Sequence, residues 1–66
     1  MSVKYSKIHV KLEGQDGNVF LIIGRVQKAM RLGGVSDSEV QEFTKEAESG
    51  DYDHALQTVM QWVGVY

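Results

Sequence analysis

Residues 35–40 read Val-Ser-Asp-Ser-Glu-Val and contain the clearest local signal in this 66-residue chain. Ser36 followed three residues later by Glu39 forms a capping box, in which each side chain satisfies a backbone N–H at the start of a helix. Asp37 adds negative charge to the first turn, where the helix dipole favours it. The flanking valines occupy the two positions of a hydrophobic staple. We therefore predict a helix from Asp37 to about Glu48.

A further helix is predicted directly downstream, because the sequence Ser49-Gly50-Asp51 ends the first helix and caps the next. Asp51 is a favourable N-cap residue, and Asp53 complements the dipole of the first turn. Apolar residues then recur at helical spacing as far as residue 63. Gly64 is predicted to end this helix.

The longest apolar block lies upstream, from Val19 to Leu32. Its apolar residues form one helical stripe, with Asn18 as a plausible N-cap and Gly33 as the C-cap. We favour a helix here. The alternative is that residues 19–23 form a strand, because short apolar runs are ambiguous in their periodicity. Residues 13–18, rich in Gly, Asp and Asn, are predicted to form a turn.

Apolar and polar residues alternate in residues 4–12, which predicts a half-buried N-terminal strand with Ile8, Val10 and Leu12 on its inner face. A strand needs a partner for its backbone polar groups. Three partners are open: residues 63–66 folding back, residues 19–23, or the same strand of a second copy in a homodimer. The predicted fold is α+β and mostly helical, with one N-terminal strand, three helices and possibly a short C-terminal strand. Residues 1–66 are predicted to form a single small domain.

The size of the chain argues against catalysis, because a domain this small buries only about 60% of its unfolded surface and has little room for a pocket. We therefore predict a non-enzymatic protein with no cofactor and no metal. The chain contains no cysteine, which excludes disulfides and thiolate ligands and favours a cytoplasmic location. No signal-like start and no apolar run of membrane-spanning length are evident, so no membrane association is predicted.

Charge is divided sharply along the chain. Residues 1–34 carry six Lys/Arg and two Asp/Glu, whereas residues 35–66 carry one lysine and seven Asp/Glu. Complementary charge directs the choice of protein partner and speeds association. We predict that the acidic half docks on a host or bacterial protein with a basic surface. The candidate contact residues are Asp37, Glu39, Glu42, Glu46, Glu48, Asp51 and Asp53.

The basic half supports an alternative function in nucleic-acid binding, since phosphate contact needs a stripe of cations. Against it, the chain has a pI of about 5.5, whereas nucleic-acid-binding domains usually lie above about 9. We therefore consider nucleic acid an unlikely partner. The candidate residues for this alternative are Lys7, Lys11, Arg25, Lys28 and Arg31.

Two smaller groups of residues have competing interpretations. The cluster Asp51-Tyr52-Asp53-His54 could bind a metal or act in acid–base chemistry, but a helix start explains it more simply. Most aromatic residues, including Phe20, lie on or beside apolar stripes and are expected in the core. Those best suited to anchor a partner at the surface are Tyr5, Trp62 and Tyr66.

Several segments resemble a family of small uncharacterised proteins from bacteria, phages and other mobile elements. They are residues 13–20 (EGQDGNVF), 24–26 (GRV), 29–31 (AMR), 49–54 (SGDYDH) and 56–58 (LQT). The resemblance covers most of the chain, and the DGN and SGDYDH segments are its most specific parts. It implies a short strand followed by helices, a cytoplasmic protein and no catalytic residues. A phage setting implies a host-directed inhibitor, such as an anti-CRISPR or other anti-defence protein.

Overall fold

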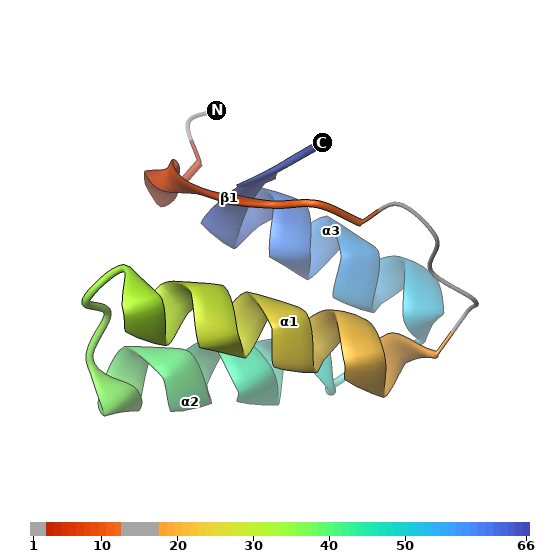
Figure 1. The fold of residues 1–66 in the computed structure, drawn as a ribbon. Helices are drawn as coiled ribbons and strands as arrows, with labels where there is room; N and C mark the ends of the chain where they lie inside the picture. The colour runs from red at the N-terminus through yellow and green to blue at the C-terminus, as the bar shows by residue number, and fades with distance from the viewer. Residues whose placement is uncertain (1–2, 13–17) are drawn as a thin grey trace.

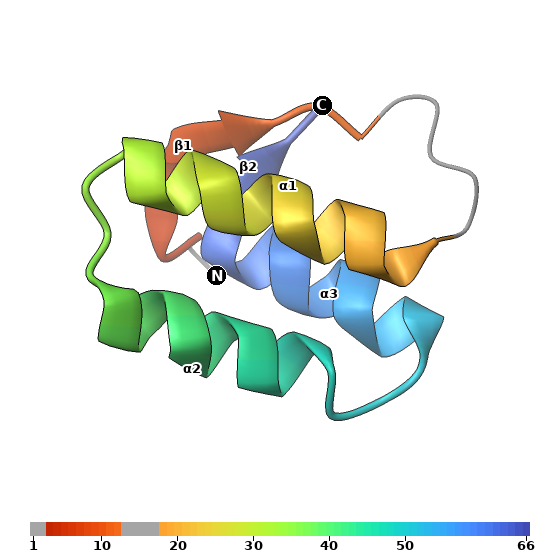
Figure 2. The ribbon, with the colours of Figure 1, turned by 60° about the horizontal axis from the view of Figure 1, so that its bottom comes forward.

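Three helices pack beneath a two-stranded sheet in the computed structural model, which describes residues 3–12 and 18–66 (Figures 1 and 2). The predicted mostly helical α+β fold is confirmed, including the short C-terminal strand. Most of the predicted turn at residues 13–18 lies outside the described residues. The elements in chain order are β1 (Tyr5–Val10), α1 (Val19–Leu32), α2 (Asp37–Ala47), α3 (Tyr52–Trp62) and β2 (Val63–Val65).

The partner of β1 is β2, which lies parallel to it. His9 pairs with Gly64 and Val10 with Val65, and the register shifts between Tyr5 and His9. Of the three open partners, the C-terminal segment is therefore the one that β1 uses within the chain. The prediction that Gly64 ends a helix is wrong. The helix ends earlier because Val63 adopts an extended backbone (φ −136°, ψ 163°), which places Gly64 inside β2.

The block after the turn is a helix, so the alternative strand at residues 19–23 is wrong. Asn18 caps α1 by accepting a hydrogen bond from the backbone N–H of Phe20 at 3.0 Å. The predicted stripe points inward through Ile22, Ile23, Val26 and Met30. Phe20 does not belong to it: its exposed fraction is 70%. Position 20 lies one helical turn before Gly24, on the same side of the helix. Gly24 is also exposed, so this side of α1 faces away from the core.

A Schellman motif ends α1. The N–H of Val35 donates to the carbonyl of Met30, and the N–H of Gly34 donates to that of Arg31. Gly33 is the C-cap, as predicted. The residue after it, Gly34, adopts a positive φ of 88°, which glycine accepts without steric cost and which this motif requires.

Two glycine substitutions, one in the middle of α1 and one within this motif, should have opposite effects. Gly24→Ala is expected to raise the free energy of unfolding by about 0.5–1 kcal/mol, because alanine is the better helix former. A Cβ at position 24 would meet no atom within 4 Å. Gly34→Ala should lower the free energy of unfolding by roughly 1–2 kcal/mol through the strained φ. Urea denaturation measures both changes; a loss at position 24 or a gain at position 34 would contradict the helix end described here.

The core is formed where α2 and α3 meet β1, β2 and α1. Phe43 of α2 is fully buried, and its ring lies edge-on to Trp62 of α3 with the centroids 5.7 Å apart. The expectation that Trp62 is a surface anchor is wrong, since its exposed fraction is only 8%. Trp62 immediately precedes β2, and the pairing of β2 with β1 encloses its side chain against Tyr5.

Candidate functional site: two charged faces

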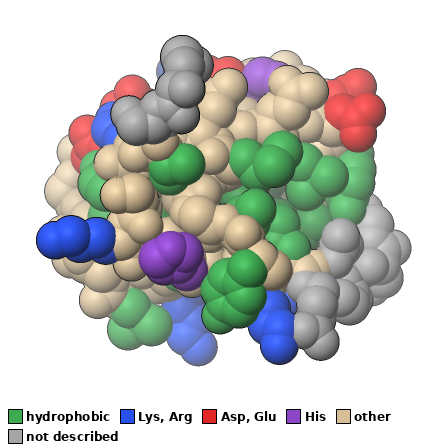
Figure 3. Space-filling view, turned by 90° about the horizontal axis from the view of Figure 1, so that it is seen from above, with side chains coloured by type: hydrophobic (Ala, Val, Ile, Leu, Met, Phe, Trp, Pro, Cys, Tyr) green, Lys and Arg blue, Asp and Glu red, His purple; other side chains and the backbone are tan. Residues whose placement is uncertain are grey.

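The charge division of the sequence becomes a division in space. The basic residues of the first half lie on β1 and α1 and in the segments that flank β1. The acidic residues of the second half lie on α2, on the α2–α3 link and at the start of α3, and Lys45 on α2 is the one cation among them. Seen from above, carboxylates lie along the upper edge of the molecule and most cations lie in the lower half (Figure 3). Where the two regions meet, Lys4 pairs with Glu39 at 3.1 Å and Arg31 with Asp37 at 3.7 Å.

Four of the seven predicted acidic contact residues have partners within the chain. Asp37 and Glu39 form the two ion pairs just described, and the Arg31–Asp37 pair is too exposed to contribute much to stability. Glu46 contacts His54. Asp51 caps α3 by accepting a hydrogen bond from the backbone N–H of His54 at 2.9 Å, as predicted.

The remaining three, Glu42, Glu48 and Asp53, are exposed, and their carboxylates make no hydrogen bond or ion pair within the described residues. Glu48 and Asp51 also line an open hollow of about 320 Å³, which Phe20 and Tyr52 share with them. We call these residues, together with the exposed carboxylates of Glu42 on α2 and Asp53 on α3, the acidic face; Glu42 lies on the side of α2 that is nearer to Tyr5. The sequence analysis expected Phe20 in the core and did not assign it to this surface. The signal that could have identified it is that position 20 falls outside the helical stripe formed by the buried residues of α1.

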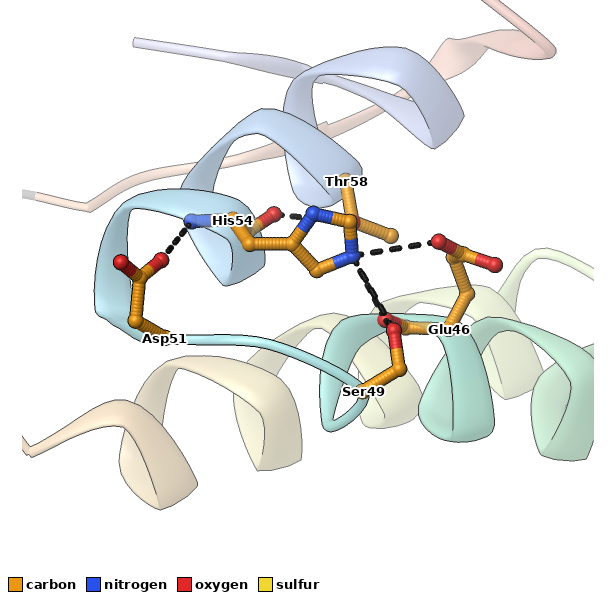
Figure 4. A network of polar contacts seen from close by, with 5 residues as sticks. All are labelled: Glu46, Ser49, Asp51, His54 and Thr58. Carbon is orange, nitrogen blue, oxygen red and sulfur yellow. Dashed lines mark hydrogen bonds and ion pairs between the residues drawn. The ribbon is translucent and has the colours of Figure 1, made fainter.

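His54 joins the end of α2 to the start of α3 (Figure 4). Its Nε2 lies 3.1 Å from both the carbonyl and the carboxylate of Glu46, and 3.2 Å from the Ser49 hydroxyl. A carbonyl oxygen only accepts hydrogen bonds, so Nε2 carries a proton and donates. Gly50 makes this approach possible, because a Cβ there would stand 2.8 Å from the Cβ of His54.

This cluster does not have the geometry of a nucleophilic relay. In such a relay, the histidine contacts the nucleophile with one ring nitrogen and the carboxylate with the other. Here Ser49 and Glu46 share the same nitrogen, and the Ser49 hydroxyl donates to the Glu46 carbonyl at 2.7 Å. The residues Asp51, Asp53 and His54 therefore act as a helix start and as a link between two helices.

A second polar cluster connects β1 with α2 and α3. The Tyr5 hydroxyl donates to the Glu39 carboxylate, and the Lys4 ammonium lies 4.4 Å from the centre of the Trp62 ring. The Glu39 carboxylate is thus bound by Tyr5 and Lys4, which lie outside its own helix, and not by the backbone at the start of α2 as the capping box predicted. The other half of the capping box is present, because the Ser36 hydroxyl accepts a hydrogen bond from the Glu39 N–H. The hydrogen bond to Glu39 raises the pKa of Tyr5 to about 12, and the same bond lowers the pKa of Glu39.

These two pKa shifts predict a stability that falls at both ends of the pH range. The folded state holds the Tyr5 proton more tightly than the unfolded chain, whose tyrosine pKa is about 10. The contribution of Tyr5 is therefore complete below about pH 10 and lost as the pH rises through 12. The contribution of Glu39 is present above its ordinary pKa and lost as the pH falls. Urea titrations across pH should show Tyr5→Phe weakening both trends and Tyr66→Phe preserving them; identical profiles for wild type and Tyr5→Phe would disprove the link.

The basic candidates divide into two groups. Lys11, Arg25 and Lys28 line one groove of about 350 Å³ between β1 and α1, together with His9. The Arg25 guanidinium also donates to the backbone carbonyl of Lys11 at 3.1 Å, which ties α1 to the end of β1. Arg31 is directed to Asp37 at the α1–α2 link, and Lys7 lies in β1 and is exposed.

Comparisons with protein-family models, with curated proteins and with solved structures found no match. The resemblance to mobile-element proteins therefore stays a prediction. Within residues 3–12 and 18–66, no group of three or more His, Cys, Asp and Glu is placed to hold a metal ion. No helix in that part of the chain combines the length and the apolar character needed to cross a membrane.

Proposed function

We propose that this chain is a non-enzymatic protein-interaction module that binds a protein with a basic surface through its acidic face. The observation that supports it best is the hollow beside Glu48 and Asp51, where Phe20 exposes 70% of its surface. Interfaces concentrate their binding energy in a few large side chains surrounded by polar residues. An exposed phenylalanine bordered by the unpaired carboxylate of Glu48 and by Asp51, the N-cap of α3, has this composition. It fits a partner that presents an apolar side chain among lysines and arginines.

The proposed partner is a host or bacterial cytoplasmic protein, including one whose basic surface normally holds nucleic acid. Carboxylates on the acidic face would occupy that surface and so inhibit or modulate the partner. An anti-CRISPR or other anti-defence role is the form of this proposal that the sequence resemblance supports. The charge separation supports only the more general form, since any basic surface would be attracted.

Capture from a bacterial lysate tests the proposal. The tagged wild-type chain is expected to retain a protein at about 50 mM salt and to lose most of it at about 500 mM, because exposed charges are screened within a few ångströms at high salt. The variant Glu42→Gln/Glu48→Gln/Asp53→Asn should retain far less. A matched control, Lys7→Gln/Lys45→Gln, removes charge outside the acidic face and should retain as much as wild type. Equal capture by both variants, or no capture at low salt, would reject the proposal.

Nucleic-acid binding is the second candidate, and the observation that favours it is the convergence of Lys11, Arg25 and Lys28 on one groove. Counterion release makes low salt the most permissive condition for such binding. A gel-shift assay at about 50 mM salt should therefore retard a labelled oligonucleotide if this function is real. An unchanged mobility would remove this candidate.

A further inference from the structure

The groove between β1 and α1 is lined by basic and apolar residues. His9, Lys11, Arg25 and Lys28 supply the basic groups, while Ala29 and Leu32 contribute apolar surface. Leu32 is unusually exposed for its size, with an exposed fraction of 80%. The Lys28 ammonium makes no ion pair or hydrogen bond within the described residues. The groove thus offers cationic and apolar contacts side by side, through residues that do not belong to the acidic face.

The outer edge of β1 faces this groove. The N–H of Tyr66 donates to the carbonyl of Val10, and the N–H of Leu12 donates to the carbonyl of Tyr66. Residues 10 and 12 therefore direct their backbone groups toward β2. Backbone groups of successive strand residues point to opposite sides, so those of His9 and Lys11 point outward. The Arg25 guanidinium, on α1, accordingly reaches the Lys11 carbonyl from this side.

We propose that an extended acidic segment of a second protein adds to β1 here as a third strand. Its backbone would pair with the outward N–H and carbonyl of His9, as in other cases of strand addition to an open sheet edge. Alternate side chains of an added strand point to opposite sides. Arg25, Lys28 and Leu32 form one stripe of α1. Carboxylates on the side of the added strand that faces α1 would therefore meet Arg25 and Lys28, and the aliphatic parts of the same side chains would cover Leu32.

Charge and hydrogen bonding favour this occupant over the others. A second copy of β1 would bring Lys7 and Lys11 close to their counterparts, and like charges oppose such pairing. The predicted homodimer through the N-terminal strand is therefore disfavoured at this edge. A nucleic-acid backbone would satisfy the cations, but its phosphates are acceptors and could not pair with the His9 carbonyl. A peptide supplies both the donors and the acceptors that a strand edge needs.

The test uses a synthetic peptide of about eight residues in which valine and glutamate alternate, a length typical of strands. Addition to the isotope-labelled full chain should shift the amide signals of residues 7–11 and 25–32. The same peptide with N-methylated alternate residues should bind at least about fivefold more weakly, because it cannot complete the ladder. Lys28→Glu should weaken binding of the unmodified peptide by a similar factor. The matched control Lys45→Glu, with the same charge change on α2, should leave it unaltered.

The other outcomes would overturn the proposal. Equal binding of the methylated peptide would mean that charge alone attracts it. Displacement of the peptide by a single-stranded oligonucleotide that shifts the same signals more strongly would assign the groove to nucleic acid. A dimer through β1, found by sedimentation without peptide, would assign the edge to self-association. Failure of the peptide to shift any groove signal at millimolar concentration would reject strand addition. Loss of protein capture by the acidic-face variant is a separate result, because that variant leaves this groove intact.

Discussion

Phe43→Ala is expected to remove a large part of the protein's free energy of unfolding. Phe43 is fully buried and contacts Trp62 edge-on in the middle of the core. Truncating a buried phenylalanine typically costs 3–5 kcal/mol, which combines the lost burial with the cavity left behind. A folded chain of 66 residues is stable by only about 3–10 kcal/mol. Urea unfolding followed by circular dichroism at 25 °C should therefore show a midpoint far below that of wild type.

Phe20→Ala is the matched control, because it makes the same change in α1 at a side chain that is 70% exposed. Its effect on the free energy of unfolding should stay within about 0.5 kcal/mol. Comparable destabilisation by the two substitutions would contradict the placement of Phe20 on the surface, and with it the apolar part of the acidic face.

Removal of residues 63–66 should have the second-largest effect. The shortened chain loses Val63, which is fully buried, and burial of a valine contributes about 1.5–3 kcal/mol. It also loses the backbone hydrogen bonds of Tyr66 to Val10 and Leu12, which leaves β1 without its partner strand. We expect a total loss of at least about 3 kcal/mol, measured by thermal and urea unfolding.

The control for this truncation is Tyr66→Ala, which keeps the backbone of β2 and its hydrogen bonds. The Tyr66 side chain is 71% exposed, so the change should cost less than about 1 kcal/mol. A shortened chain as stable as wild type would show that β1 does not depend on β2, and would restore the possibility that β1 pairs with another copy.

Local signals predicted the helices well, because each helix start depends on side chains close in sequence. Ser36 and Asp51 cap α2 and α3 as predicted, and the 3.6-residue period of α1 identified its buried side. The sequence alone does not distinguish the C-terminal strand from the two other possible partners of β1, because the contact joins opposite ends of the chain. Pairing of Val10 with Val65 is a non-local interaction that periodicity in either segment cannot reveal.

The candidate site was predictable in composition but not in detail. The sequence identified the acidic residues, and the fold places them on α2 and around the start of α3. It could not show that Glu39 binds Tyr5 and Lys4, or that Glu46 binds His54, because these partners come from other elements. It also placed Phe20 in the core, since an apolar residue beside a stripe differs from a buried one only by its angle around the helix.

The most direct test of the proposed function is the salt dependence of binding to the protein that the chain captures. Isothermal titration at several salt concentrations should show that affinity falls with added salt. It should also show Glu42→Gln/Glu48→Gln/Asp53→Asn binding at least about tenfold more weakly with a shallower salt dependence. The control variant Lys7→Gln/Lys45→Gln should bind the captured protein with the same affinity as wild type, because it leaves the acidic face unchanged. An affinity that is independent of salt and unchanged in the acidic-face variant would contradict the claim that this face makes the contact.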